Sequence, residues 1–205
     1  MFTLIQGPMG AGKTTHLKSL VDNNKKAYEL KKIDYRETII FVNYYKDQQR
    51  YGPNVLTHTG LVDKDQIYIK TLDEIPKMQN YKTAERIFIN ELQMFNDTSR
   101  WILQLLKDKK IVYACGLSAT ADQKLWPSIV NVMPFVTDHI YLKAFCSFCV
   151  EHTATMTIKV DNCSNKDNSN TNGNTGKSDD SFNIVIGSFD IFKPICLKCF
   201  LLRSN

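Results

Sequence analysis

A chain of 205 residues, 43% of them hydrophobic, is long enough to bury one principal core with a small appendage. No run in it approaches the roughly 20 apolar residues that cross a bilayer, and its start, MFTLIQG, lacks signal-peptide and transit-peptide features, so we expect a cytoplasmic protein without a membrane partner. The net charge of +5 is mild and the lysines form scattered pairs, which argues against a nucleic-acid partner.

Five apolar, β-branched runs alternate with helical patterns along the first two thirds of the chain. Strands are expected at residues 2–5, 38–44, 66–72, 86–92 and 111–117. Helical spacing predicts one helix over 15–32 and another over 97–110, the second capped by Thr98 or Ser99. Because each strand is apolar on both alternations, we expect an α/β fold whose parallel sheet is covered on both faces.

The pattern changes after residue 140 to short strands around two cysteine pairs. Within this part, residues 161–181 are rich in Asn, Ser and Gly and have almost no apolar side chain, so we expect a disordered insert. Two domains are therefore predicted, a nucleotide-binding domain over 1–142 and a cysteine-bearing domain over 143–205.

The segment GPMGAGKT, residues 7–14, fits the phosphate-loop pattern G-x-x-x-x-G-K-[ST] between the first strand and the first helix. In such a loop the backbone N–H groups turn toward phosphate, the lysine neutralises its charge, and the threonine hydroxyl can bind Mg²⁺. We expect a nucleoside triphosphate, taken to be ATP, although the loop does not define the base. The residues expected to bind it are Gly7, Pro8, Met9, Gly10, Ala11, Gly12, Lys13, Thr14 and Thr15.

Two CxxC pairs, CSFC and CLKC, are separated by residues 150–195. Their four thiolates match the tetrahedral coordination of Zn²⁺ and leave no position for an activated water, so the site is expected to be structural. The expected ligands are Cys146, Cys149, Cys196 and Cys199. Redox-active dithiols are the alternative, which a single CxxC at the start of a helix would favour more. Cys115 and Cys163 are assigned to neither role.

Six segments in chain order carry a family resemblance. GPMGAGKT looks like G-P-M-[FY]-[SA]-G-K-[ST], YYKDQQRY like K-x-[AS]-x-D-x-R-Y, and THTG like [ST]-H-[DN]-G. INELQMF is similar to I-D-E-[AG]-Q-F-F, CGLSATADQKLWP lies where a G-L-D-x-[TD]-F segment is expected, and IVIGSFDIFKPICLKC is similar to V-x-[IV]-G-x-x-x-x-Y-x-x-x-C-R-x-C. Together they resemble the small, zinc-containing thymidine kinases of animal cells, poxviruses and bacteria over nearly the full length.

This resemblance implies transfer of the ATP γ-phosphate to the 5′-hydroxyl of thymidine or deoxyuridine for nucleotide salvage. It also implies a RecA-like parallel sheet, a zinc-binding lobe whose lasso loop covers the nucleoside, Mg²⁺, and a homotetramer. Matched by position, Glu91 is the general base, Arg50 and Lys13 are the catalytic cations, and Asn90 lies near the metal. The implied nucleoside contacts are Met9, Gln93, Met94, Leu117, Val185, Ile186, Gly187 and Phe192.

Four positions depart from the family pattern. Asn90 and Ser118 replace aspartates, Thr59 replaces an acid, and Ala121 replaces an aromatic residue. A neutral oxygen can still orient a water of Mg²⁺, because substrate phosphates and one hydroxyl hold most of the ion. Loss of a stacked aromatic ring affects nucleoside affinity more than the chemical step. We therefore expect an active kinase that is slower or altered in its substrate preference.

Two other interpretations stay open. If these departures abolish turnover, the chain is a weakened or inactive nucleoside-triphosphate-binding paralogue, because a fold alone does not fix function. GAGKT followed by GLSATA also suggests a helicase-like ATPase fragment. Such motors need two RecA-like domains, for which this chain is too short once the cysteine-bearing part is set aside. Turnover with thymidine and DNA-stimulated ATP hydrolysis distinguish these interpretations.

Overall fold

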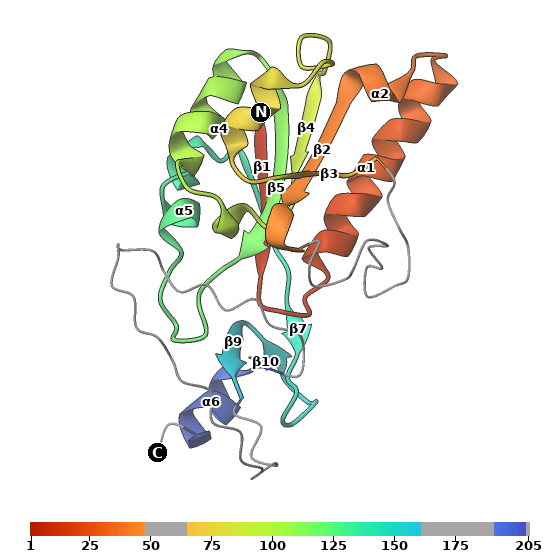
Figure 1. The fold of residues 1–205 in the computed structure, drawn as a ribbon. Helices are drawn as coiled ribbons and strands as arrows, with labels where there is room; N and C mark the ends of the chain where they lie inside the picture. The colour runs from red at the N-terminus through yellow and green to blue at the C-terminus, as the bar shows by residue number, and fades with distance from the viewer. Residues whose placement is uncertain (48–64, 161–190, 204–205) are drawn as a thin grey trace, which may run out of the picture.

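The sheet at the centre of the molecule is parallel throughout. The computed structural model describes residues 1–47, 65–160 and 191–203. The central strands are β1 (Phe2–Gly7), β2 (Ile39–Tyr44), β3 (Ile67–Ile69), β4 (Arg86–Ile89), β5 (Ile111–Leu117) and β6 (Asp138–Tyr141). They lie in the order β3-β2-β4-β5-β1-β6, and each neighbouring pair runs parallel (Figure 1). The predicted α/β fold with a parallel sheet is confirmed.

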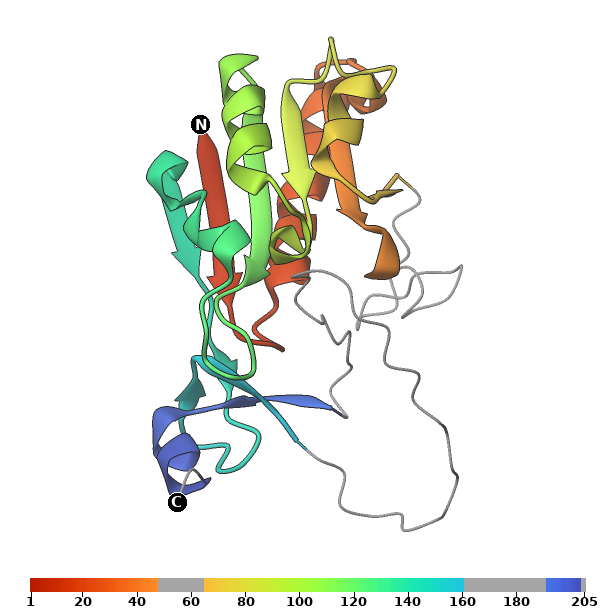
Figure 2. The same ribbon diagram turned by 60° about the vertical axis from the view of Figure 1, so that its left-hand side comes forward.

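Side chains of the central strands alternate between two apolar layers. Along β4, Ile87 and Ile89 face one layer and Phe88 faces the other, and all three are fully buried. The first layer packs against α4 (Thr98–Lys107) and the second against α1 (Lys13–Leu30), so helices cover both faces of the sheet (Figures 1 and 2). This double cover is the physical reason why these strands are apolar at consecutive positions.

The two edges of the sheet differ most from the prediction. The sequence analysis missed β6, whose residues are largely exposed because it lies at the edge and pairs only with β1 among the described strands. At the opposite edge β3 is shorter than predicted. Its chain turns at Thr71, where the Glu74 side chain accepts from the Thr71 backbone N–H at 3.0 Å and a short 3-10 helix begins.

The predicted cap of the second helix is wrong. Asp97 occupies the position before α4 in a left-handed conformation, and Thr98 is already the first helical residue. Thr98 is buried, and its hydroxyl donates to the carbonyl oxygen of Ser128 at 2.6 Å. Because Thr98 is already inside the helix, its hydroxyl is not in the position before the first turn from which a cap accepts backbone N–H groups.

A small lobe lies beyond the carboxyl ends of the central strands (Figure 1). It consists of two antiparallel pairs, β7 (Ala144–Phe145) with β8 (Thr153–Ala154) and β9 (Met156–Lys159) with β10 (Phe192–Ile195), and of α6 (Leu197–Arg203). The other helical segments within the described residues are α2 (Tyr35–Thr38), α5 (Pro127–Val130), η1 (Leu72–Lys77), η2 (Leu92–Met94) and η3 (Met133–Phe135). The domain division after residue 142 stays a prediction, and the expected insert over 161–181 lies outside the described residues.

None of the helices in the described ranges combines the length and the apolar character that crossing a bilayer requires.

Candidate active site

The phosphate loop joins the end of β1 to the start of α1 in a backbone path that requires glycine. A Cβ atom on Gly7 would lie 2.4 Å from the carbonyl oxygen of Leu142. Gly12, directly before α1, has a φ of 79°, in the left-handed region that favours glycine. Because α1 has 18 residues, its free N–H groups and dipole face the loop and favour an anion there.

Lys13 folds back across this loop. It is 8% exposed, and its Nζ donates to the carbonyl oxygen of Pro8 at 2.7 Å. Burial lowers the pKa of Lys13, and the negative charge of Glu91 opposes that shift. A phosphate at the loop would offer the buried ammonium an anionic partner in addition to the neutral carbonyl.

Asn90 follows β4 directly and is 1% exposed. Its Oδ1 accepts hydrogen bonds from the Thr14 hydroxyl at 3.2 Å and from the Cys115 thiol at 2.9 Å. The residue predicted near the metal is therefore in contact with the threonine predicted to bind it.

Glu91 adopts an unusual backbone conformation, with φ of 55° and ψ of 44°. Left-handed geometry is uncommon outside glycine and persists where the surrounding structure enforces it, often at functional sites. The carboxylate is half-buried, and its Oε2 accepts from Gln93 Nε2 at 2.5 Å. The strained turn thus places a fixed carboxylate at the carboxyl end of the sheet.

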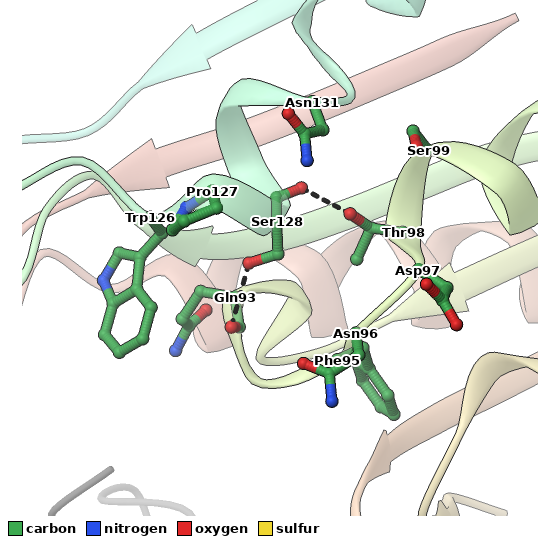
Figure 3. Close-up of a pocket in the computed structure, with 10 residues that line it drawn as sticks. All are labelled: Gln93, Phe95, Asn96, Asp97, Thr98, Ser99, Trp126, Pro127, Ser128 and Asn131. Carbon is green, nitrogen blue, oxygen red and sulfur yellow. Dashed lines mark hydrogen bonds between the residues drawn. The ribbon is translucent and has the colours of Figure 1, made fainter. Parts of the chain in front are cut away.

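Gln93 connects this carboxylate to β5. Its Oε1 accepts from the Leu117 N–H at 3.1 Å. Its backbone oxygen accepts from the Ser128 hydroxyl at 3.0 Å, as Figure 3 shows. Gln93 is 3% exposed, so both ends of its amide are committed within the protein. Its predicted nucleoside contact stays a prediction, while the observed geometry is that of a side chain that orients Glu91.

Gln93 also lines a pocket of about 240 Å³ (Figure 3). Its lining consists of Gln93, residues 95–99, residues 126–128 and Asn131. Gln93 is the only predicted site residue in that lining, so the pocket is not the phosphate site.

The other predicted catalytic and nucleoside-contact residues fall into two groups. Met9, Met94, Leu117 and Phe192 are half-buried, with Leu117 ending β5 and Phe192 opening β10. The second group lies outside the described residues and consists of Arg50, Val185, Ile186 and Gly187.

Asp47 is a site candidate that the sequence analysis did not assign. It is half-buried, and its Oδ2 accepts from Asn43 Nδ2 at 2.8 Å. It follows the carboxyl end of β2, and its negative charge contributes to the raised pKa of the buried Cys115 thiol. The acid within the segment YYKDQQRY was the available signal.

The four predicted cysteine ligands converge in the small lobe. Their Sγ atoms all lie within 4.8 Å of one another, and Cys149 and Cys196 are 3.9 Å apart. Four thiolates bound at about 2.3 Å to one zinc ion would lie roughly 3.8 Å apart. The donor set and its spacing are consistent with a structural zinc site.

Thr157 connects this lobe to the phosphate loop through a hydrogen bond. Its Oγ1 accepts from the Met9 N–H at 2.9 Å, and its backbone oxygen accepts from Gln123 Nε2 at 2.8 Å. Ala11 packs against the apolar cluster around the cysteines. Sequence patterns gave no signal for Thr157, because a single threonine in a short strand is unremarkable until its partner is known.

The strand order, the phosphate loop after β1 and the carboxylate after β4 define a P-loop nucleotide-binding phosphotransferase. The family model for thymidine kinase matches residues 1–200, so the chain belongs to the thymidine kinase family and to the ATP-dependent nucleoside kinases. This confirms the resemblance and favours a kinase over a helicase-like fragment.

Similar proteins occur in viruses and bacteria. The thymidine kinase of Amsacta moorei entomopoxvirus is 29% identical over 203 residues, covering 96% of each chain. That of Pseudothermotoga lettingae is 28% identical over 200 residues, covering 97% of this chain and 93% of its own. That of Rabbit fibroma virus (strain Kasza) is 29% identical over 199 residues, covering 96% and 94%.

The cysteine cluster predicts about one zinc ion per chain. We expect Cys199→Ser to lose most of the zinc and to weaken ATP binding, because the lobe that holds Met9 through Thr157 loses its fold. Zinc can be measured by mass spectrometry and ATP affinity by calorimetry.

His152→Ala is the matched control. Its Nδ1 lies 3.5 Å from Cys149 Sγ, yet four cysteines already complete a tetrahedron, so zinc content should not change. Wild-type protein with less than about half an equivalent of zinc would contradict the assignment.

A second prediction concerns the support of Glu91. A Cβ added at Gly116 would lie 2.7 Å from Gln93 Oε1, so Gly116→Ala should push the amide away from the Leu117 N–H. We expect kcat to fall by about tenfold because the carboxylate loses its fixed orientation, while the KM for ATP stays unchanged. Steady-state kinetics test this, and an unchanged kcat would show that Gln93 does not position Glu91.

Proposed function

We propose that this chain transfers the γ-phosphate of ATP to the 5′-hydroxyl of thymidine or deoxyuridine, as a salvage enzyme for DNA synthesis. The observation that carries the proposal is the Glu91 carboxylate, held in a left-handed turn at the end of β4 next to the phosphate loop. A phosphoryl transfer needs such a positioned acceptor for the hydroxyl proton.

The phosphate loop would hold the triphosphate through its N–H groups and Lys13. The Thr14 hydroxyl, which donates to Asn90 Oδ1, would hold Mg²⁺ with an oxygen lone pair, because its hydrogen is already directed at the amide. When bound, the ion neutralises charge on the phosphates. Lys13 supplies the same kind of neutralisation from the protein.

Glu91 would act on the acceptor nucleoside. The 5′-oxygen forms a bond to the γ-phosphorus as the bond from that phosphorus to the β–γ bridging oxygen breaks, ADP leaves, and the hydroxyl proton passes to the carboxylate. Gln93 Nε2 donates to Glu91 Oε2, which would leave Oε1 of that carboxylate to face the substrate. Gln93 is thus a positioning residue that acts through Glu91.

The nucleoside would lie among the half-buried Met9, Met94 and Leu117, with Phe192 at the edge of the lobe. Ala121 offers no ring to stack on the base, so the apolar contacts carry more of the affinity. Arg50 and the backbone of 185–187 stay predictions for the phosphate and the base edge. So do a homotetramer, which size-exclusion chromatography with light scattering tests, and a cytoplasmic location.

An inactive nucleotide-binding paralogue is the second candidate, because the neutral Asn90 contacts Thr14, the residue expected to hold the metal. Steady-state turnover of ATP with thymidine decides between the two functions.

Glu91→Gln keeps the shape of the side chain and removes the proton acceptor. We expect turnover to fall by about two to four orders of magnitude, while ATP affinity changes little because the phosphate loop is untouched. Single-turnover kinetics and calorimetry measure the two quantities. A variant with wild-type turnover would place the base on another residue.

Substrate choice gives an independent test. A site that pairs buried polar groups with a pyrimidine edge should reject purine nucleosides, and one methyl group contributes only about 1 to 3 kcal/mol, so thymidine and deoxyuridine should differ little. The test compares kcat/KM for thymidine, deoxyuridine, deoxycytidine and deoxyguanosine. Equal values for thymidine and deoxyguanosine would contradict the proposed substrate class.

A further inference from the structure

The amide oxygen of Asn90 accepts two hydrogen bonds. Thr14 Oγ1 lies 3.2 Å and Cys115 Sγ 2.9 Å from Asn90 Oδ1. An amide oxygen offers two lone pairs, so this pair of hydrogen bonds uses both. Asn90 therefore has no lone pair left on that oxygen for a water of Mg²⁺, which differs from the role expected from the sequence.

Cys115 is linked to the phosphate loop through Asn90, which contacts both Cys115 and Thr14. It belongs to β5, is 1% exposed, and packs in the apolar layer beneath α1. Burial, followed by the negative charge of Glu91, raises the pKa of its thiol to about 12. The thiol keeps its proton at neutral pH and is a hydrogen-bond donor.

We propose that Cys115 is a positioning residue for the metal site, because its thiol fixes the Asn90 amide with the oxygen toward Thr14. The Thr14 hydroxyl then directs its hydrogen at Asn90 and its lone pairs toward the place of a divalent cation. This inference rests on the proposed function in one respect, since it assumes that the phosphate loop binds ATP together with Mg²⁺.

The need for such a donor follows from the difference between asparagine and aspartate. An amide has one oxygen and one NH₂ group, so a 180° flip would turn a donor toward the Thr14 hydroxyl and reverse its hydrogen bond. A carboxylate has two equivalent oxygens and needs no such fixing. The thiol should therefore matter with Asn90 in place and lose its effect in the Asn90→Asp background.

The experiment measures binding of a non-hydrolysable ATP analogue by calorimetry across a magnesium titration, without nucleoside. Cys115→Ala makes the side chain smaller and Cys115→Val makes it larger, and both remove the hydrogen-bond donor. Cys115→Ser keeps a donor. We expect the first two to raise the magnesium concentration for half-maximal tightening by about two- to tenfold, the range of one net hydrogen bond. Cys115→Ser should stay near the wild-type value.

The double variants separate positioning from packing. In the Asn90→Asp background, which should itself need less magnesium, Cys115→Ala should shift the midpoint by less than about twofold. Thermal melting of each protein establishes that it is folded, and if Cys115→Ala does not fold, Cys115→Val and Cys115→Ser carry the comparison.

Equal shifts in both backgrounds would overturn the inference in favour of simple packing, and so would unchanged midpoints in the Ala and Val variants. Failure of the wild-type protein to bind the analogue with magnesium at all would instead count against the proposed function. The two failures are thus distinguishable.

Discussion

The site depends on one constraint: the parallel strands all end at the same end of the sheet, where their carboxyl ends lie side by side. β4 pairs with β5 and β5 pairs with β1, so the residues that follow each strand meet although they are far apart in the chain. The phosphate loop follows β1 at Gly7, Asn90 and Glu91 follow β4, and Leu117 ends β5. The nucleotide-binding loop, a metal-binding side chain and the general base can therefore lie in one site that rigid strands support.

The small lobe adds a second support from the opposite direction. The phosphate loop is attached to α1 on one side and to β9 on the other, through the bond between Met9 and Thr157. Since Gln123 also bonds Thr157, the loop after β5 rests on the same threonine. We expect the cysteine cluster, by folding the lobe, to support the backbone of the phosphate loop as well.

Local sequence patterns predicted the features that depend on the local sequence alone. Continuous apolar runs predicted β1, β2, β4 and β5, which are largely buried, and the edge strand β3 in a longer form than observed. The glycine-rich loop and the two CxxC pairs were predictable because their spacing alone indicates the geometry. β6 was missed because its edge position leaves it exposed, and the Thr98 cap was wrong because Thr98 is itself the first residue of α4.

For the candidate site, the sequence predicted which residues take part but not which of them contact one another. Glu91, Lys13 and Thr14 lie where the motifs place them, but no pattern indicates that Gln93 spans Glu91 and Leu117, or that Cys115 bonds Asn90. These partners depend on strand register, which brings β4 and β5 side by side. Under the proposed function, the neutral Asn90 would remove one negative charge from a site that accepts a triphosphate. Repulsion of ATP would then be reduced and attraction for Mg²⁺ weakened, so the orientation of the Thr14 hydroxyl would matter more than it would beside a carboxylate.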